Sequence, residues 1–572
     1  MKRDNLFKFL IVVYFLFSSF ISNVFAQKPT INKVEPPNWW ANHSYSNVQL
    51  LVYGKNLSSV KVNSLDEKIK IENVVHSNDD HIFIYINLTK SAFPGKYKFT
   101  FTNGEGIDTL IFQLFNRDSV KNIHQGFSNE DVVYLIFPDR FVNGDQTNDF
   151  LFNDKEEFEF RSLNGRHGGD IQGIIDKLDY LKELGITTIW VTPLLENNTY
   201  MSYHGYAATN LYKVDPRFGT NNLYQELVKK AHDKGLKIIY DHVSNHIGIN
   251  HEWVSNLPTE TWINGAPNNH LPADHNKVAL VDIHADKKSI TDIDNGWFVD
   301  TMPDLNQTDS LLAKYIIQNT IWWIEYSGID GIREDTYPYS NQKFMSVWAK
   351  TILEHYQNFN IVGEVWKGEP AILAAFQRDS YFPNELNTNL PAVTDFAIRD
   401  ALYDYMSGKS DLQKIYETFG EDFVYSDLNN LLVFFDNHDI DRAMFDAKGD
   451  IAKYKQALTI VLTSRGIPQI FYGTEIGLDG GGHHGKIRAE FPGGFSNDSI
   501  NAFTKTGRTE KQNEIFNFTQ KLLHLRKDYS ALRKGKLTQY PPKENIYVYK
   551  KVLESEEIII FLNGNNDEKE IQ

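Results

Sequence analysis

The chain has 572 residues, 41% of them hydrophobic and 23% charged, which is typical of a soluble globular protein with more than one domain. Its formal net charge of −16 argues against nucleic acid or an anionic membrane as a partner, because both require a basic face. The sequence has no cysteine, which excludes disulfides, thiolate metal sites and a cysteine nucleophile.

The first residues have the layout of an export signal. Lys2 and Arg3 precede an apolar run that ends at Val24, Phe25 and Ala26. We predict a signal peptide over residues 1–26, so that the mature protein is exported, either periplasmic or secreted. An uncleaved membrane anchor is the alternative, but the apolar run is short for a bilayer span. No membrane insertion is therefore expected after cleavage.

Residues 27–118 are rich in strand-forming residues. The runs VQLLVYGKNL, HIFIYINL and KYKFTFTNG are separated by Gly, Asn and Pro, and no helical period is present. This pattern predicts an N-terminal β-sandwich.

Residues 119–527 repeat one pattern, an amphipathic helix followed by glycine and a short apolar strand. IQGIIDKLDYLKELG precedes ITTIWVTP, and LLAKYIIQNTIWWIEYSG precedes IDGIRED. Such alternation predicts a parallel sheet, and the number of repeats favours a closed (β/α)8 TIM barrel within a multidomain α/β protein. A doubly wound open sheet is the alternative, but no glycine-rich phosphate loop follows the early strands.

Two segments depart from this repeat. Residues 247–306, after the third strand, are rich in Asn, Asp, His, Trp and Pro, and we predict a loop domain over the barrel mouth. Residues 528–572 are strand-like again and predict a C-terminal β-domain. That stretch is short for a finished β-domain, so a truncated domain is one interpretation.

Polar residues gather where the predicted barrel strands end, which is where barrel active sites are built. Three carboxylates, an arginine, histidines and a tyrosine stand at these ends: Asp335, Glu364, Asp439, Arg333, His246, His438 and Tyr206, with Asp241, Asn245 and His204 beside them. Any one acid alone could be merely ion-paired. Together, in a chain without a cysteine nucleophile, a serine elbow or a nucleotide loop, they indicate glycosidic chemistry by a retaining mechanism.

Alternation along a strand divides the residues of the fourth barrel strand. Arg333 and Asp335 point to the same side, so the arginine favours the ionised form that a nucleophile needs. Glu334 points the other way, and we expect a structural role for it. Apolar neighbours of Glu364 favour the protonated form that a general acid needs.

These segments resemble the ordered motifs of the α-amylase family (glycoside hydrolase family 13). The matching wordings, in the family's order, are DHVSNH, MPDLN, GIRED, GEVW, FFDNHD and GIPQIFYGTE. The resemblance implies Asp335 as nucleophile, Glu364 as general acid/base and Asp439 as transition-state stabiliser. It also implies that Tyr206, His246, Arg333 and His438 bind the sugar at the cleaved bond. Arg442 is expected to bind sugar too, or to form a surface ion pair.

The loop NGDQTND offers hard oxygen ligands of the kind that calcium prefers. Alone it is also an ordinary turn, but it resembles the calcium loop of the neopullulanase and cyclomaltodextrinase branch. That resemblance implies a structural Ca²⁺ ion held by Asn143, Asp145, Asn148, Asp149, Gly168 and Asp170. The second calcium site of typical α-amylases, at Asn245, is not predicted.

The N-terminal module and the wordings DPRFGT and RAEFPGGF also resemble this branch, in particular the periplasmic neopullulanases of bacterial starch-utilisation systems. The resemblance implies retaining hydrolysis of α-1,4-glucosidic bonds in maltooligosaccharides, cyclodextrins or pullulan. An α-glucan transglycosylase and a non-catalytic glucan-binding protein are the alternatives. Residues 336–339, Thr-Tyr-Pro-Tyr, replace the Lys-His of many α-amylases.

The expected partners are α-glucan oligosaccharides, and a homodimer through the N-terminal domain is a further hypothesis. Trp39 and Trp40 of that domain are read as sugar-stacking, core or interface residues.

Overall fold

The computed structural model describes residues 27–117, 123–151, 160–199 and 201–570. It divides into two compact units, residues 1–117 and residues 118–572, whose described parts are taken separately below. The predicted signal peptide lies outside the described residues.

The first unit consists of two four-stranded sheets, which confirms the predicted N-terminal β-domain. One sheet has the order β1-β3-β6-β5 and the other the order β2-β8-β7-β4. The strands are β1 (Thr30–Glu35), β2 (Asn38–Ala41), β3 (Asn47–Lys55), β4 (Lys61–Ser64), β5 (Ile69–His76), β6 (His81–Leu88), β7 (Gly95–Asn103) and β8 (Gly106–Asn116). Trp39 is fully buried and Trp40 nearly so, and Trp39 donates a hydrogen bond to the Tyr45 carbonyl at 3.1 Å. Both tryptophans are therefore core residues of this unit.

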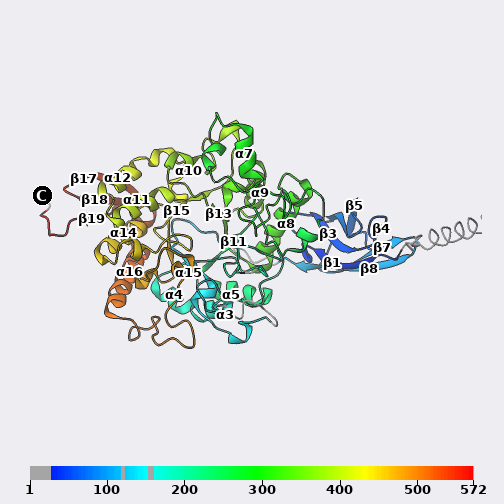
Figure 1. Ribbon diagram of the computed structural model, residues 1–572, viewed down its shortest axis with the longest axis horizontal. Coiled ribbons are helices and arrows are strands. Elements are labelled where there is room, and N and C mark those ends of the chain that lie inside the picture. Colours follow the sequence, from blue (N-terminus) through cyan, green and yellow to red (C-terminus); the bar gives the residue numbers. More distant parts are fainter. Residues whose placement is uncertain (1–26, 118–122, 152–159, 200, 571–572) are drawn as a thin grey trace, which may run out of the picture. The chain divides into compact units, whose positions relative to one another are not determined.

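The second unit contains a closed barrel of eight parallel strands, as predicted (Figure 1). The strands are β9 (Val133–Ile136), β10 (Thr188–Val191), β11 (Lys237–His242), β12 (Gly331–Glu334), β13 (Asn360–Gly363), β14 (Ala392–Thr394), β15 (Leu431–Val433) and β16 (Ile467–Phe471). They pair in chain order, and β16 closes the barrel onto β9. Almost every strand residue is buried on both faces, which explains why the sequence shows short apolar runs rather than alternation.

Helices connect successive strands. They are α2 (Pro138–Phe141), α3 (Ile171–Asp176), α4 (Leu178–Leu184), α5 (Asn221–Asp233), α6 (Glu252–Ser255), α7 (Lys287–Asp294), α8 (Ser310–Ser327), α9 (Gln342–His355), α10 (Pro370–Phe376), α11 (Phe396–Ser407), α12 (Leu412–Gly420), α13 (Ala443–Asp446), α14 (Ile451–Thr463), α15 (His484–Ile487), α16 (Glu510–Asp528) and α17 (Ser530–Lys534).

Helix α8 shows how the sequence sets these boundaries. The Asp309 carboxylate accepts hydrogen bonds from the backbone N–H groups of Leu311 and Leu312, which caps the helix start. Gly328 ends the helix with φ 81°, a left-handed conformation that glycine adopts without steric cost. The chain then turns directly into β12, the strand that ends at the candidate site.

The excursion between β11 and α8 contains α6, the short helix η3 (Lys277–Leu280) and α7. Single β-bridges fasten it, and the bridge between His246 and Asp304 joins its two ends. Trp253, Trp262 and Trp297 are buried within it. These aromatic side chains give the excursion a core of its own, although it has little regular structure.

A three-stranded antiparallel sheet ends the described chain, which confirms the predicted C-terminal β-domain. Its strands are β17 (Lys536–Lys543), β18 (Ile546–Leu553) and β19 (Glu556–Asn563). No helix in the described part of the chain is both long and apolar enough to span a membrane.

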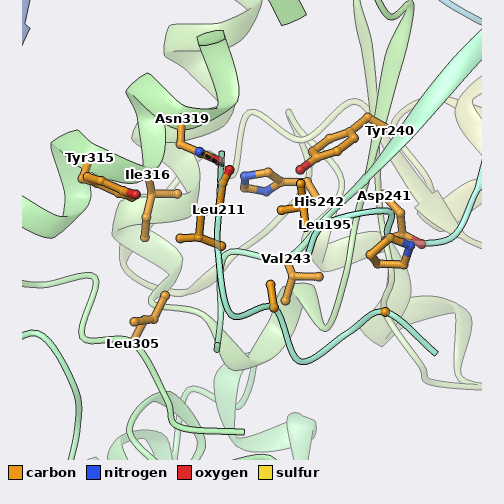
Figure 2. A pocket seen from close by; sticks show the side chains of 13 residues that line it. Leu195, Leu211, Tyr240, Asp241, His242, Val243, Leu305, Tyr315, Ile316 and Asn319 are labelled. Atoms are coloured by element: carbon orange, nitrogen blue, oxygen red, sulfur yellow. Dashed lines mark hydrogen bonds between the residues drawn. The ribbon is translucent and has the colours of Figure 1, made fainter. Parts of the chain in front are cut away.

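A cavity of about 20 Å³ lies behind the end of β11 (Figure 2). Leu195, Leu211, Leu305 and Ile316 form its apolar wall, and Asn319 adds a polar group. A space of this size holds about one water molecule. It is therefore too small for an organic ligand.

Candidate active site

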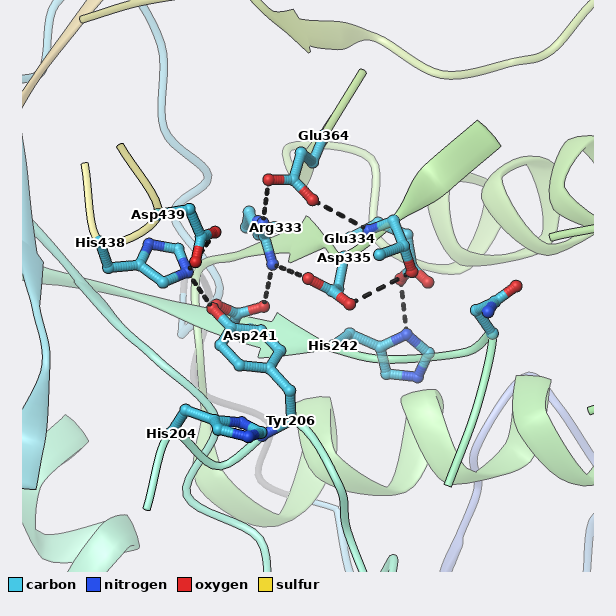
Figure 3. A network of polar contacts seen from close by, with 12 residues as sticks. His204, Tyr206, Asp241, His242, Arg333, Glu334, Asp335, Glu364, His438 and Asp439 are labelled. Carbon is cyan, nitrogen blue, oxygen red and sulfur yellow. Dashed lines mark hydrogen bonds and ion pairs between the residues drawn. The ribbon is translucent and has the colours of Figure 1, made fainter. Parts of the chain in front are cut away.

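The guanidinium of Arg333 lies at the centre of three carboxylates (Figure 3). Its Nη1 donates to Asp241 at 2.9 Å and to Asp335 at 2.6 Å, and its Nη2 pairs with Glu364 at 2.8 Å. Arg333 is in β12, Asp241 is in β11 and Glu364 directly follows β13, so three neighbouring strands meet here. Two of the three acids predicted for catalysis, Asp335 and Glu364, thus contact one guanidinium.

The backbone after β12 holds Asp335 in place. Thr336 has φ 44°, a left-handed conformation that is rare for a β-branched residue. In this conformation the Thr336 N–H donates to Glu364 at 3.2 Å, and the Thr336 hydroxyl donates to Asp335 at 3.2 Å. One strained residue therefore contacts both acids.

In the view of Figure 3, Asp439 lies on the other side of Arg333 from Asp335. Its carboxylate is 3.1 Å from His438 Nε2 and accepts a hydrogen bond from Arg488 Nη2 at 2.8 Å. Its side chain is 24% exposed, so it can reach a ligand. The Tyr206 ring stacks on His438 with centroids 5.5 Å apart, and its hydroxyl donates to Asp241 at 2.9 Å.

Burial and charge act against each other in this group. Burial raises the pKa of Asp335 well above its usual range, Arg333 lowers it, and the charges of Glu364 and Asp241 raise it further. Burial likewise raises the pKa of Asp241 to about 6. At Asp335 the guanidinium does not outweigh burial and the neighbouring carboxylates, so the protonated form of this acid is favoured. The expectation that Arg333 favours the ionised form of Asp335 is therefore correct in direction, but burial has the larger effect.

Asp439 differs from those acids. Burial opposes its charge, but His438, Arg488 and Arg333 outweigh burial and lower its pKa to about 2. Asp439 is therefore ionised at neutral pH and accepts hydrogen bonds from hydroxyl groups.

Glu334 points away from this pocket, as the alternation predicts. Its carboxylate accepts a hydrogen bond from His242 Nδ1 at 2.6 Å and another from the Ser244 N–H at 3.1 Å. His242 Nε2 in turn lies 3.0 Å from the Thr320 hydroxyl, which accepts a bond from Trp348 at 2.9 Å. This network joins β12 to β11, α8 and α9, so Glu334 has a structural position.

His246 lies beside the group rather than in it. Its Nε2 is 3.0 Å from the Tyr206 carbonyl, its Nδ1 is 3.3 Å from the Asn245 amide, and its ring stacks on Phe298. Burial lowers the pKa of His246 to about 4. The neutral ring therefore orients the Tyr206 loop from behind.

Arg442 is not brought to this pocket, contrary to expectation. It is fully buried, donates to the carbonyls of Ile487 at 2.7 Å and Tyr472 at 2.6 Å, and stacks on Phe471. It is therefore neither a surface ion pair nor exposed to a ligand.

Arg488 belongs to this group but was not predicted from the sequence. Besides Asp439, its guanidinium donates to the His438 carbonyl at 2.8 Å and to the Tyr203 hydroxyl at 3.2 Å. It comes from the loop after β16, within the wording RAEFPGGF, which drew attention only as a family signature. A buried arginine in a polar loop after a barrel strand was the available signal.

The predicted calcium ligands gather in a second cluster, between α2 and α3. The Asp170 carboxylate accepts hydrogen bonds from the N–H groups of Asp145 at 2.8 Å and Gly173 at 2.7 Å, and the Asn143 amide donates to Asp149 at 2.8 Å. Gly168, with φ 90°, is packed so closely that an added Cβ would lie 2.4 Å from an Asp149 oxygen.

The free oxygens of this cluster fit a hard cation. Asn143 Oδ1 and Asn148 Oδ1 are buried and have no hydrogen-bond partner. Asp145 instead uses its carboxylate to cap the short helix η1 (Gln146–Asn148). Among the described residues no group of three or more His, Cys, Asp or Glu side chains is arranged to hold a metal. A cation here would depend on the amide and main-chain oxygens as well.

Comparison with known families gives three matches along the chain. Residues 135–535 match the family model "Alpha amylase, catalytic domain", residues 33–118 match "Cyclomaltodextrinase, N-terminal" and residues 537–572 match "Cyclo-malto-dextrinase C-terminal domain". The three matched ranges cover, in turn, nearly all of the barrel, of the N-terminal sheets and of the C-terminal sheet.

Individual proteins that this chain resembles are named as amylases and cyclomaltodextrinases. A beta/alpha-amylase of Paenibacillus polymyxa is 31% identical over 76% of this chain, which spans only 33% of that relative's length. A cyclomaltodextrinase of Thermoanaerobacter pseudethanolicus is 28% identical over 88% of this chain and 85% of its own. Among solved structures, an Anoxybacillus α-amylase has a TM-score of 0.64 and 31% identity, covering 76% of this chain and 87% of its own. An α-amylase of Geobacillus thermoleovorans complexed with acarbose has a TM-score of 0.62 and 29% identity, with the same coverage.

Proposed function

We propose, from the premise that this chain belongs to the α-amylase family and is a glycoside hydrolase, that it cleaves α-1,4-glucosidic bonds with retention of anomeric configuration. The observation that carries the proposal is the Arg333 guanidinium, which contacts both Asp335 and Glu364, while Asp439 lies on the other side of it from Asp335. The substrates proposed are maltooligosaccharides, cyclodextrins and pullulan. Relatives named cyclomaltodextrinase and α-amylase support that range.

Each side chain has a defined part in this proposal. Asp335 attacks the anomeric carbon while Glu364 donates its proton to the leaving oxygen, giving a covalent glycosyl-enzyme intermediate. Glu364 then removes a proton from the attacking water. When the substrate is bound, the mechanism requires Asp335 as a carboxylate and Glu364 as a carboxylic acid.

Asp439, Arg488 and Tyr206 bind the sugar at the cleaved bond. Because Asp439 is ionised and partly exposed, it accepts hydrogen bonds from ring hydroxyls, and these strengthen as positive charge develops on the sugar. Tyr206 stacks on both His438 and His204, and these contacts fix its ring beside the sugar.

Three substrates offered side by side test the proposal. Mature protein is incubated with β-cyclodextrin, pullulan and amylose, and the anomeric form of the first product is followed by NMR. Initial release of the α-anomer supports a retaining α-glucan hydrolase. Initial release of the β-anomer, or failure to cleave any of the three, rejects the proposal.

A transglycosylase is the second candidate, since it shares the covalent intermediate and differs only in the acceptor. The relatives named cyclomaltodextrin glucanotransferase favour keeping it. Incubation with concentrated maltotriose separates the two, because transfer gives chains longer than the substrate. A non-catalytic glucan-binding protein is disfavoured, because all three acids are present and clustered.

We further propose a structural Ca²⁺ ion at Asn143, Asn148, Asp149, Gly168 and Asp170, supported by the two unpartnered amide oxygens. Bound there, it would tie the loop after α2 to the start of α3. Metal analysis of the purified protein should find about one calcium per chain, and EGTA should lower the Tm. A Tm that is unchanged by EGTA, and by Asn148→Ala, would count against the ion.

We also propose that the protein is exported after cleavage of the signal peptide and that its N-terminal domain mediates a homodimer. The N-terminal sequence of protein recovered from the periplasm or medium should begin after about Ala26. Light scattering on that protein should give the mass of a dimer if the N-terminal domain mediates association, and the mass of a monomer would exclude it.

A further inference from the structure

Lys277 has a charged group without a partner close to the catalytic acids. It is the first residue of η3 in the excursion between β11 and α8, and it is only 9% exposed. Among the described residues its ammonium forms no ion pair and no hydrogen bond, and the atom lies 4.9 Å from the centre of the Tyr339 ring. Its stem is buried, whereas the ammonium is not among the fully buried unpartnered atoms of the described residues, so it is accessible to a ligand.

Tyr339 fixes the position of that lysine. It ends the short helix η4 (Tyr337–Tyr339), which begins two residues after Asp335, and it is 4% exposed. Its hydroxyl is 2.7 Å from His275 Nδ1, and its ring meets Phe298 edge-on at 5.3 Å. The Lys277 ammonium therefore lies over a rigid ring, held by the excursion on one side and by the loop after β12 on the other.

The charges around Lys277 show which part of the pocket it faces. Burial lowers its pKa, the Glu364 carboxylate opposes that effect, and Lys367 adds to it. The Tyr339 ring under the ammonium lies four residues after Asp335, and Glu364 is the catalytic acid whose charge acts on Lys277. We therefore place Lys277 beside Glu364. A general acid contacts the leaving oxygen, so this is the side on which the leaving sugar departs.

No other cation is available from the loop that follows the nucleophile, since residues 336–339 read Thr-Tyr-Pro-Tyr. We propose that Lys277 binds hydroxyl groups of the glucosyl residue on the leaving-group side, and so determines how well sugars act as leaving group and as acceptor. This inference rests on the proposed α-glucan hydrolysis. It assigns the leaving-sugar subsite to a side chain of the excursion rather than of the barrel.

The test compares two substrates that differ only in what leaves. Maltotriose releases a sugar that carries hydroxyl groups, whereas 4-nitrophenyl α-maltoside cleaved at the aryl bond releases a phenol without them. The variant is Lys277→Met, which keeps the stem over Tyr339 and removes the charge. Lys287→Met is the matched control, because Lys287 belongs to the same excursion and is exposed.

We expect Lys277→Met to reduce kcat/KM for maltotriose about tenfold more than for the aryl maltoside, mainly through KM, and Lys277→Arg to restore most of the loss. Transfer to added maltose should fall in parallel. Equal losses on both substrates, or a maltotriose rate like that of Lys287→Met, would overturn the assignment. If the Met variant does not fold, as judged by circular dichroism, Lys277→Gln replaces it in the same comparison.

The split between the kinetic constants separates this role from a structural one. Loss of a subsite contact should raise KM for maltotriose and leave kcat for the aryl maltoside unchanged, whereas a structural defect should lower kcat on both substrates. A fall in kcat on both substrates in Lys277→Met would overturn the assignment. If the wild-type chain cleaves no α-glucan, the proposed function itself fails, which is a different result from a silent Lys277 variant in an active enzyme.

Discussion

Arg333 and Glu334 are consecutive buried residues, yet the networks they enter are of opposite kinds. The Glu334 network is closed, by which we mean that all its polar side-chain atoms have partners. His242 and Ser244 bond to Glu334, Thr320 bonds to His242, and none of these side chains has an unpartnered polar atom among the described residues. The Arg333 network is open, because Arg333 Nε and His438 Nδ1 are buried without a partner and Asp439 is partly exposed. The comparison teaches that two adjacent buried charges differ in how completely their neighbours satisfy them, and that the incompletely satisfied one lies at the candidate site.

The largest effect is expected from the open network. Asp335→Asn removes the nucleophile and should lower kcat by about 10⁴-fold or more. Because the change removes a carboxylate that burial disfavours, the Tm should stay the same or rise. Steady-state kinetics and thermal melts of the purified variant check both halves, and retained turnover would contradict the assignment.

The closed network should respond in the opposite way. Glu334→Gln disturbs a fully buried, hydrogen-bonded acid, and we expect a loss of about 3 kcal/mol in the free energy of unfolding. The protein that remains folded should keep most of its kcat. Urea melts beside kinetics provide the measurement, and a kcat loss as large as that of Asp335→Asn would abolish the contrast between the two networks.

Arg488 sharpens the comparison, since only the structure places it in the open network. Arg488→Met should lower kcat/KM about 10²-fold, because Asp439 loses the donor that orients it. Arg442→Met is the matched control, because Arg442 is a buried arginine outside the site. This variant should be less stable than the wild type but have the same KM. Equal kinetic effects in both variants would show that Arg488 acts only through folding.

The last prediction concerns a half-buried acid outside both networks, and it affects stability rather than activity. Burial raises the pKa of Asp294, at the end of α7, to about 7. The folded chain then holds a proton that the unfolded chain releases, so wild-type stability falls as pH rises from about 4 to about 7. Asp294→Asn lacks this term, and its Tm relative to wild type should rise across that window. A constant Tm difference would show that Asp294 is already ionised in the folded protein.

The barrel was predictable because its signals are local. Helical spacing, a capping acid and a following glycine, as at Asp309 and Gly328, fix an element without knowledge of its neighbours. The ends of the strands then identify Asp335, Glu364 and Asp439 together, since parallel strands deliver their last residues to one face.

What escaped prediction depends on contacts between distant loops. Arg488 reaches Asp439 across 49 positions of the sequence, and Lys277 meets Tyr339 through an excursion without periodicity. The prediction for Arg442 was wrong for a related reason. Its motif places it next to the site in sequence, but buried carbonyl acceptors decide where its side chain points.

The hydrogen-bond ladder between neighbouring strands continues past the end of β12 and β13, since the Asp335 N–H donates to the His242 carbonyl and the Glu364 N–H donates to the Glu334 carbonyl, both at 2.9 Å. The distance between the backbone positions of Asp335 and Glu364 is thereby set by the fixed spacing of neighbouring β-strands. Insertions and substitutions in the connecting segments leave that distance untouched. Substrate specificity can therefore differ between related chains while the arrangement of the two reacting acids stays the same.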